Sequence, residues 1–216
     1  MDATFLTKTA LFRGIPPVEL EEMLRQLRAE TRRYPRGGVI YHAGEAVSAM
    51  GLVLSGSVSI ENNDVWGNKS ILDRVGPGQV FAEAYACTPG EPLMIQAVAA
   101  EPAEILFLEV GGGLPGRLLE NLLAISARKN LKLSRRMFHI SAKSIRGRLR
   151  SYLSFQAAQH RSRTFEIPFN RQQLADYLGV DRSALSNELS KMRREGLLEV
   201  TRNRFTLLGL DPEEGA

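Results

Sequence analysis

Apolar positions follow a helical spacing near both ends of the chain and a shorter, glycine-punctuated spacing between them. Residues 4–29 carry apolar side chains about one helical turn apart, and Pro16-Pro17 is typical of a helix start. From Thr31 to Val110, short apolar runs alternate with glycine-containing turns. Short strands at this spacing are typical of an antiparallel β-barrel or jelly roll. The runs predict strands at 38–41, 50–54, 57–60, 70–75 and 105–108, with turns at 35–38, 42–45, 62–64, 76–78 and 88–90.

A long uninterrupted helix is predicted after this barrel, because residues 117–143 contain neither glycine nor proline. Alternating steps of four and three connect one row of positions, which is the spacing of a coiled-coil seam. Asn130 is a polar member of that row, and such a residue often fixes register and partner number. A helix that packs on its own barrel is the alternative. We expect a dimer interface formed by Leu119, Leu123, Asn130, Leu133, Met137 and Ile140.

The most informative stretch is 167–207. Asn170 is expected to cap a short helix, and Gly179 permits the left-handed residue that ends it. Asp181 is expected to cap a second helix, which Gly196 ends. Two short strands then flank a basic turn at 201–204. This order predicts a winged helix-turn-helix, a DNA-binding motif. The inward positions of its two helices are Leu174, Ala175, Leu178, Leu185, Leu189 and Met192.

The second of these helices is expected to enter the major groove with its first turns against base edges. Arg182 can pair with guanine or a phosphate, and Asn187 can pair with adenine. Arg171 lies at the start of the preceding helix, where the duplex backbone passes. A helical hairpin with an ordinary charged surface is the alternative. The predicted DNA-binding residues are Arg171, Gln172, Arg182, Ser183, Ser186, Asn187, Lys191 and Arg204.

Ser144 suits the N-cap of a further helix at 145–160, so the polar break at 141–144 predicts a hinge. We therefore expect three parts. Residues 1–116 form a sensory barrel with N-terminal helices, 117–143 a dimerisation helix, and 144–216 a winged helix-turn-helix domain.

Charge separates the same two halves of the chain. The net formal charge of +4 combines −5 over residues 1–127, +12 over 128–204 and −3 over 205–216. A basic segment joined to an acidic one is typical of a nucleic-acid-binding half attached to another module. An arginine-rich solvated surface is the alternative.

The composition of the chain indicates the cellular compartment in which the protein works. No run approaches the roughly 18 apolar residues of a membrane helix, and the first residues do not form a signal peptide. Cys87 is the single cysteine, which excludes an intrachain disulfide and a multi-cysteine metal site in one chain. We expect a cytoplasmic protein.

Barrel, long helix and winged helix-turn-helix in this order resemble the Crp/Fnr family of transcription regulators. The resemblance covers nearly the whole chain, is strongest over 169–207, and is clear in Gly-Pro-Gly-Gln-Val-Phe-Ala-Glu at 76–83. It implies an α+β protein whose barrel at 30–110 binds an effector and reorients the DNA-binding domains. The implied partners are double-stranded DNA, a second copy of the chain and, for an activator, RNA polymerase. The resemblance implies no enzymatic activity.

Departures from the family pattern concern the effector. Cyclic-AMP binders of the family carry a Gly-Glu pair and then an Arg-Ser or Arg-Thr pair. This chain has Ala82-Glu83, and residues 92–98 contain no arginine. Because an unpaired buried phosphate is costly, cyclic AMP in the usual mode is not expected. The Fnr-like cysteine cluster is also absent, which excludes its iron–sulfur centre. We expect a neutral or hydrophobic effector, or none, in a pocket formed by Ala82, Glu83, Ala84, Leu93, Met94, Ile95, Gln96 and, across the long helix, Asn130, Leu133 and Ser134.

The recognition helix departs from the family as well. Many relatives carry glutamate at the position of Ser183 and a second arginine at that of Asn187. We therefore expect a half-site that differs from the family's common one.

Other reactive side chains do not form a site in the sequence. The histidines are scattered, and His42 with Glu45 is expected in a surface turn rather than a metal site. Cys87 is expected to be a small buried hydrophobe. Two alternatives to a DNA-binding regulator stay open. One is a ligand-binding barrel that acts as a protein-interaction module. The other is a cupin-type enzyme, for which the His-x-His cluster is missing.

Overall fold

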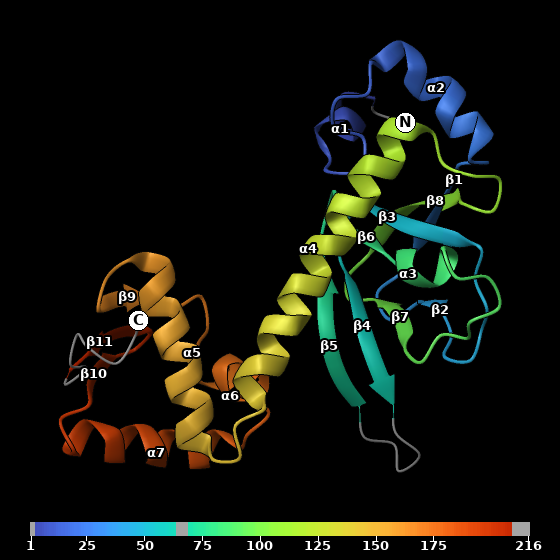
Figure 1. Cartoon of the computed structure of the whole chain (residues 1–216). Helices are drawn as coiled ribbons and strands as arrows, with labels where there is room; N and C mark the ends of the chain where they lie inside the picture. Colours follow the sequence, from blue (N-terminus) through green and yellow to red (C-terminus); the bar gives the residue numbers. More distant parts are fainter. Residues whose placement is uncertain (1–2, 64–68, 209–216) are drawn as a thin grey trace. The chain divides into compact units, whose positions relative to one another are not determined.

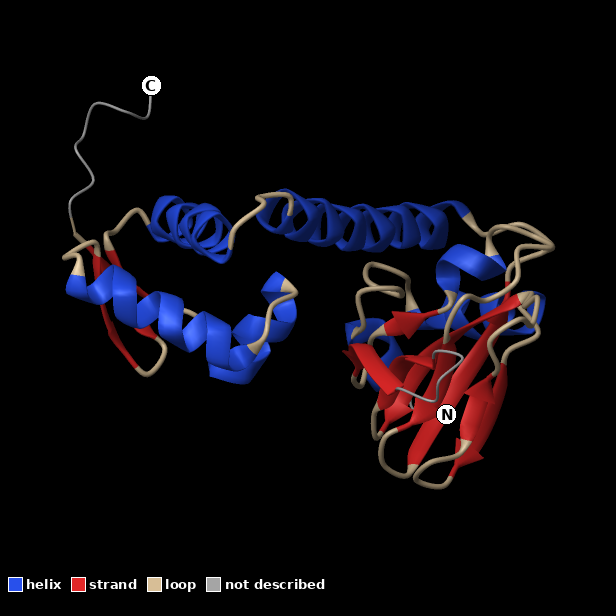
Figure 2. Cartoon of the chain, turned by 90° about the horizontal axis from the view of Figure 1, so that it is seen from below, coloured by secondary structure: helices blue, strands red, loops and turns tan. Residues whose placement is uncertain are grey.

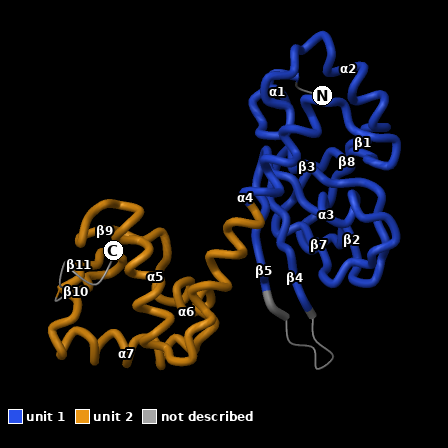
Figure 3. Tube along the Cα trace, viewed as in Figure 1, with its two compact units in different colours: residues 1–128 blue, residues 129–216 orange. Residues whose placement is uncertain are grey.

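The computed structural model describes residues 3–63 and 69–208. It divides into two compact units, residues 1–128 and 129–216, shown in different colours in Figure 3. The division falls inside one helix, α4 (Gly116–Ile140). The domain boundary expected between 143 and 144 stays a prediction.

Unit 1 is a β-sandwich with two short helices before it. Two four-stranded antiparallel sheets have the strand orders β1-β8-β3-β6 and β2-β7-β4-β5 (Figures 1 and 2). This arrangement confirms the predicted jelly-roll type of barrel. The elements are α1 (Ala3–Lys8), α2 (Pro17–Gln26), β1 (Glu30–Tyr34), β2 (Val39–Tyr41), β3 (Ala49–Ser55), β4 (Val58–Asn63), β5 (Lys69–Val75), β6 (Val80–Phe81), α3 (Glu83–Ala86), β7 (Gln96–Ala99) and β8 (Ala103–Glu109).

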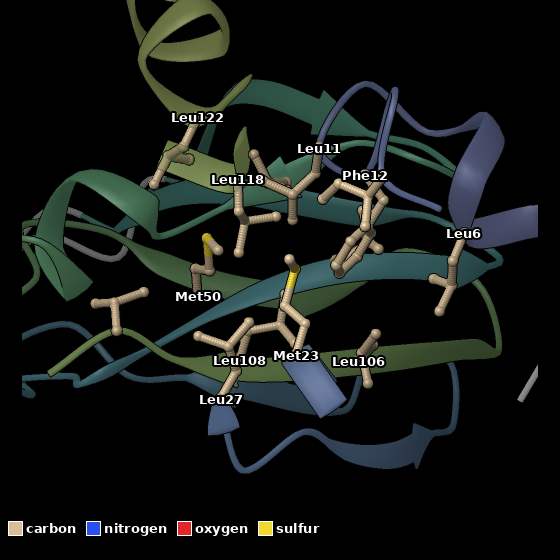
Figure 4. Packing of buried hydrophobic residues seen from close by; sticks show 14 of the residues in the cluster. Leu6, Leu11, Phe12, Met23, Leu27, Met50, Leu106, Leu108, Leu118 and Leu122 are labelled. Atoms are coloured by element: carbon tan, nitrogen blue, oxygen red, sulfur yellow. The ribbon is translucent and has the colours of Figure 1, made fainter. Parts of the chain in front are cut away.

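The N-terminal helices and the start of α4 cover one face of this sandwich. Leu118 and Leu122 of α4 are buried against residues of α1, α2, β3 and β8 (Figure 4). Burial of a leucine side chain contributes about 1.5–3 kcal/mol to folding. The first two turns of α4 are therefore fixed to the sandwich. The labelled members of this core are Leu6, Leu11, Phe12, Met23, Leu27, Met50, Leu106, Leu108, Leu118 and Leu122.

Unit 2 contains the second half of α4 and a small helical domain. Its three-stranded sheet has the order β10-β11-β9, and its core joins α5, α6 and α7 to that sheet. Ser144 caps α5, with its Oγ accepting a hydrogen bond from the Gly147 amide at 3.0 Å, as expected. The elements are α5 (Ile145–His160), β9 (Thr164–Glu166), α6 (Arg171–Leu178), α7 (Arg182–Arg194), β10 (Leu198–Thr201) and β11 (Arg204–Leu207).

Several elements differ from the sequence prediction. Strand β1 was missed because four of its five residues are exposed, so it has no apolar alternation and pairs with β8 through its backbone. Helix α4 ends at Ile140 rather than near Lys143. Strand β4 continues through Asn63, and Asp64 of the turn expected at 62–64 lies outside the described residues.

Candidate functional site

Local capping signals build the helix-turn-helix. Asn170 and Gln173 form a reciprocal capping box at the start of α6: the Asn170 Oδ1 accepts from the Gln173 amide at 2.9 Å, and the Gln173 Oε1 accepts from the Asn170 amide at 2.9 Å. Gly179 ends α6 with φ +62°, the left-handed conformation that favours glycine. Both expectations for this helix are confirmed.

Asp181 caps α7, as the sequence predicts. Its Oδ1 accepts hydrogen bonds from the Ser183 amide at 2.7 Å and the Ala184 amide at 3.0 Å. The Ser183 hydroxyl and these amides hold the pKa of Asp181 below its ordinary value. The buried side chains of α7 are Leu185, Leu189 and Met192.

The opposite side of α7 is exposed and carries the predicted base-reading residues. Arg182, Ser183 and Asn187 are exposed, and Ser186 is half-buried. Ser183 donates its hydroxyl proton to Asp181 Oδ1 at 2.5 Å, and Ser186 donates its own to the Arg182 carbonyl at 2.9 Å. Arg182 and Asn187 side chains make no hydrogen bond within the described part of the chain. Of these four side chains, those of Arg182 and Asn187 therefore keep their donors available to a ligand.

The residues expected at phosphates lie around the same motif. Arg171 is half-buried at the start of α6, with its guanidinium carbon 6.0 Å from the centre of the Phe205 ring. Burial lowers the pKa of Arg171, although arginine keeps its charge in proteins. An open groove of about 480 Å³ lies beside it, lined by Pro168, Phe169, Asn170, Arg171, Gln173, Arg202 and Asn203.

The other expected phosphate contacts are spread more widely. Gln172 is exposed on α6, but its Nε2 donates to the Asp176 Oδ1 at 2.8 Å. Lys191 is exposed in the last turns of α7, and Arg204 is exposed at the start of β11, beside the wing turn. Their roles on DNA stay predictions.

Ion pairs that the sequence does not indicate hold α7 in place. Arg146 of α5 donates to Glu188 Oε1 at 2.5 Å and to both Glu195 carboxylate oxygens at 2.7 and 2.9 Å. The hydrogen bonds to Arg146 lower the pKa of Glu195. The partners lie more than 40 residues apart in the sequence, so no local pattern indicates them.

The predicted effector pocket includes the residue between β6 and α3, residues of α3 and the segment before β7. Ala82 adopts φ +58°, a left-handed conformation that costs a non-glycine residue about 1–2 kcal/mol. Glu83 is 6 % exposed and Glu61 3 % exposed, and Gln96 Nε2 donates to Glu61 Oε2 at 3.2 Å. No lysine or arginine is buried among the described residues. Among the described residues, the charged side chains buried in the sandwich are therefore carboxylates.

The predicted pocket residues differ in burial. Leu93 is buried, Ile95 and Gln96 are half-buried, and Ala84 and Met94 are exposed, the latter at 77 %. Asn130, Leu133 and Ser134 lie in unit 2, where Ser134 Oγ donates to Asn130 Oδ1 at 3.2 Å. A shared pocket stays a prediction.

Helix α4 carries a second apolar face beside the buried one. Leu119, Leu123, Leu133 and Met137 are 52–67 % exposed, Asn130 is exposed and Ile140 is half-buried. These are the residues of the predicted dimer seam. Exposed leucines in such a row are typical of an interface with another chain.

The remaining reactive residues form no further site. Cys87 is exposed, so the expectation of a buried hydrophobe is wrong: it follows the last turn of the short helix α3, outside the core. His42 lies in a turn where its amide donates to Glu45 Oε2 at 3.0 Å, as expected. Within 3–63 and 69–208, no group of three or more His, Cys, Asp or Glu side chains is placed to hold a metal. None of the described helices is long and apolar enough to span a membrane.

His139, in the last turn of α4, is buried at 1 % exposure. Its Nδ1 lies 3.0 Å from Ser151 Oγ, while no described residue pairs with its Nε2. The rings of Phe155, Tyr152 and Tyr177 surround it at 5.3–6.2 Å. Burial lowers the pKa of His139.

Unfolding of unit 2 should therefore depend on pH through His139. The unfolded chain binds a proton at the ordinary histidine pKa of about 6.5, and the folded chain only at lower pH. Stability is thus fully present above that value and falls as pH drops through it toward the folded pKa. When the pH is lowered from about 7.5 to about 5.5, the melting temperature of His139→Phe should fall less than that of the wild type. His160→Phe, which removes a largely exposed histidine, is the control. Equal losses in wild type and His139→Phe would contradict this account.

Comparison with known proteins gives one consistent result. Residues 31–111 match the Cyclic nucleotide-binding domain family, and residues 147–213 match the Crp-like helix-turn-helix domain family. The chain is 30 % identical over 195 residues to the "Cyclic AMP receptor protein" of Thermus thermophilus, covering 88 % of each.

Solved structures agree in fold. The Thermus thermophilus catabolite activator protein aligns over 92 % of this chain and 93 % of its own, with TM-score 0.51 and 24 % identity. OCPA-complexed CprK aligns over 88 % of this chain and 90 % of its own, with TM-score 0.55 and 16 % identity. The match to the Crp-like helix-turn-helix does not favour the protein-interaction alternative. With this sandwich, this long helix and this winged helix-turn-helix, the chain belongs to the Crp/Fnr family of transcription regulators.

Proposed function

We propose that the protein works as a twofold dimer that reads a near-palindromic DNA site with the first turns of α7. The observation that carries this proposal is the exposed face of α7. Arg182 and Asn187 lie on this face near the Asp181-capped start of the helix, while the opposite face is buried. Phosphate contacts come from residues of α6, the end of α7 and the start of β11, namely Arg171, Gln172, Lys191 and Arg204. Dimerisation through α4 places two such faces on one duplex.

The domain roles follow from the same arrangement. Residues 1–116 sense an effector, 117–143 dimerise, and 144–216 bind DNA. The proposed effector is neutral or hydrophobic, and a barrel that binds no effector is the alternative. RNA polymerase is the further partner if the protein activates transcription. We assign no catalytic residue to the protein.

Selection from a random DNA library by the full-length protein tests the proposal. Enriched sequences should be near-palindromes with half-site centres about one helical turn, or about 10 base pairs, apart. The affinity should fall steeply with salt, because phosphate contacts release counterions. A library that yields no enriched sequence would favour a protein-interaction module instead.

Cyclic nucleotides should bind poorly. Residues 92–98 contain no arginine, and the charged side chains buried among the described residues of the sandwich are the carboxylates of Glu61 and Glu83. A cyclic phosphate there would lose its hydration without gaining a cation. Calorimetry of the full-length protein with cyclic AMP and with cyclic GMP should show no submillimolar binding. A micromolar isotherm with either nucleotide would overturn this reading of the barrel.

A further inference from the structure

The carbonyl end of α6 is held by two arginines from outside the helix-turn-helix. Arg136 of α4 donates from Nη2 to the Asp176 carbonyl and from Nε to the Tyr177 carbonyl, both at 2.9 Å. Arg148 of α5 donates from Nη1 to the Leu178 and Gly179 carbonyls, both at 3.0 Å. Four consecutive carbonyls therefore accept guanidinium N–H groups. The last carbonyls of a helix lack partners within it and carry its negative dipole end, which explains the fit.

These four carbonyls belong to the turn that aims the recognition helix. Gly179 ends α6, and Asp181 starts α7 two residues later. A guanidinium that fixes the Asp176–Gly179 carbonyls thus fixes the direction in which α7 leaves the turn. Arg136 does so from α4, the helix that also carries the exposed seam.

Further contacts make the last turns of α4 part of the DNA-binding unit. Arg148 Nε donates to the Ala142 carbonyl at 3.0 Å, so the segment between α4 and α5 is tied to the same arginine. The Arg136 guanidinium carbon lies 5.8 Å from the Tyr177 ring centre, and the buried His139 ring packs against Tyr152 and Tyr177. Within unit 2, α4 is therefore attached to α5 and α6 by both polar and aromatic contacts.

We infer that Arg136 is a positioning residue for DNA recognition, which ties the orientation of α7 to α4. The inference rests on the proposed dimer. In that dimer the seam of α4 sets the relative orientation of the two copies. Arg136 then fixes, in each copy, the orientation of the turn before α7 relative to α4. The distance and angle between the two recognition helices, and so the half-site spacing that the protein accepts, depend on this contact. Arg136 itself touches no base in this account.

Half-site spacing is the measurement that separates positioning from other roles. One inserted base pair moves the half-sites apart by about 3.4 Å and turns them by about 35°. The experiment first selects an operator with the wild type. It then measures the affinity of full-length variants for that operator and for versions with one or two base pairs inserted at the centre. The readout is the ratio of the two affinities.

For the wild type, we expect insertion to lower the affinity by about tenfold or more, and for Arg136→Ala by about twofold or less. Arg136→Lys retains the charge but not the two-pronged donor geometry, so it should behave like Arg136→Ala. Arg128→Ala removes one exposed positive charge from the same helix and should keep the wild-type ratio. Melting curves and dimer mass of each variant check that it is folded and assembled.

The outcomes are distinct. If Arg136 bound a phosphate or only stabilised the domain, Arg136→Ala would weaken binding to all spacings alike and leave the ratio unchanged, which would overturn the inference. If Arg136→Ala does not fold, Arg136→Lys decides by the same ratio. If the wild type itself shows no preference for spacing, the proposed dimeric readout fails rather than the role of Arg136.

Discussion

Replacing Leu133 and Met137 by glutamate should convert the protein to monomers and lower its affinity for the selected operator by about 100- to 10,000-fold. The two side chains are 61 % and 67 % exposed on the seam of α4. In the proposed dimer they pack against the same residues of a second copy. Two pairs of like charges in that seam would cost more than the apolar contact contributes. A monomer offers one recognition helix to a two-half-site operator and loses the gain from simultaneous binding.

The double variant is informative because its positions are exposed in a single chain. Each unit should keep its own core and its melting behaviour. Val18→Glu is the matched control: Val18 is 84 % exposed on α2 and is not part of the seam, so this variant should stay dimeric and bind DNA normally. Sedimentation equilibrium at micromolar concentration gives the mass. A wild-type protein that sediments as a monomer would refute the dimer, whatever the variant does.

Local signals account for what could be predicted from the sequence. Asn170, Gly179 and Asp181 act on backbone groups within four residues of themselves, so their roles in the helix-turn-helix follow from residue type and spacing. The same holds for Ser144 at α5. Apolar runs between glycine turns predicted β2, β3, β4, β5 and β8, each of which places at least one apolar side chain in the core.

Elements without such signals could not be predicted. Strand β1 reads Glu-Thr-Arg-Arg-Tyr and forms only because its backbone pairs with β8, some 70 residues later. The arginines that hold the helices of unit 2 together are even harder to predict from the sequence. Arg146 meets Glu188 and Glu195, while Arg136 and Arg148 meet carbonyls of α6, each 30 or more residues away. In the sequence these arginines are indistinguishable from a solvated basic surface.

The effector region shows a different kind of limit. The absence of arginine from 92–98 is visible in the sequence. Only the structure shows that the Glu61 and Glu83 side chains are buried in the sandwich. The exposure of Cys87 depends on where the short helix α3 ends, which no periodicity indicates. Ligand identity depends on the combined shape of these groups rather than on any one residue.

Base readout should depend on Arg182 and Asn187, and phosphate binding on Arg171. Arg182 and Asn187 are exposed in the first two turns of α7, the part of a recognition helix that reaches the groove floor. Arg182→Ala or Asn187→Ala should each cost about 1–3 kcal/mol on the selected operator and little on random DNA. Arg171 lies at the start of α6 beside the open groove, where the duplex backbone would pass.

Arg171→Ala should accordingly weaken specific and random DNA alike and lower the slope of log affinity against log salt by about one. Because Arg171 also lies over the Phe205 ring, Arg171→Lys is the companion variant that retains the charge and should restore the slope. Ser190→Ala, at an exposed position of α7 beyond the first two turns, is the control for the base-reading pair. Selection from a random library, repeated with each variant, gives the preferred sequence directly. If Asn187→Ala leaves that sequence unchanged while Arg171→Ala alters it, the two roles are the reverse of those assigned here, and α6 rather than α7 reads the bases.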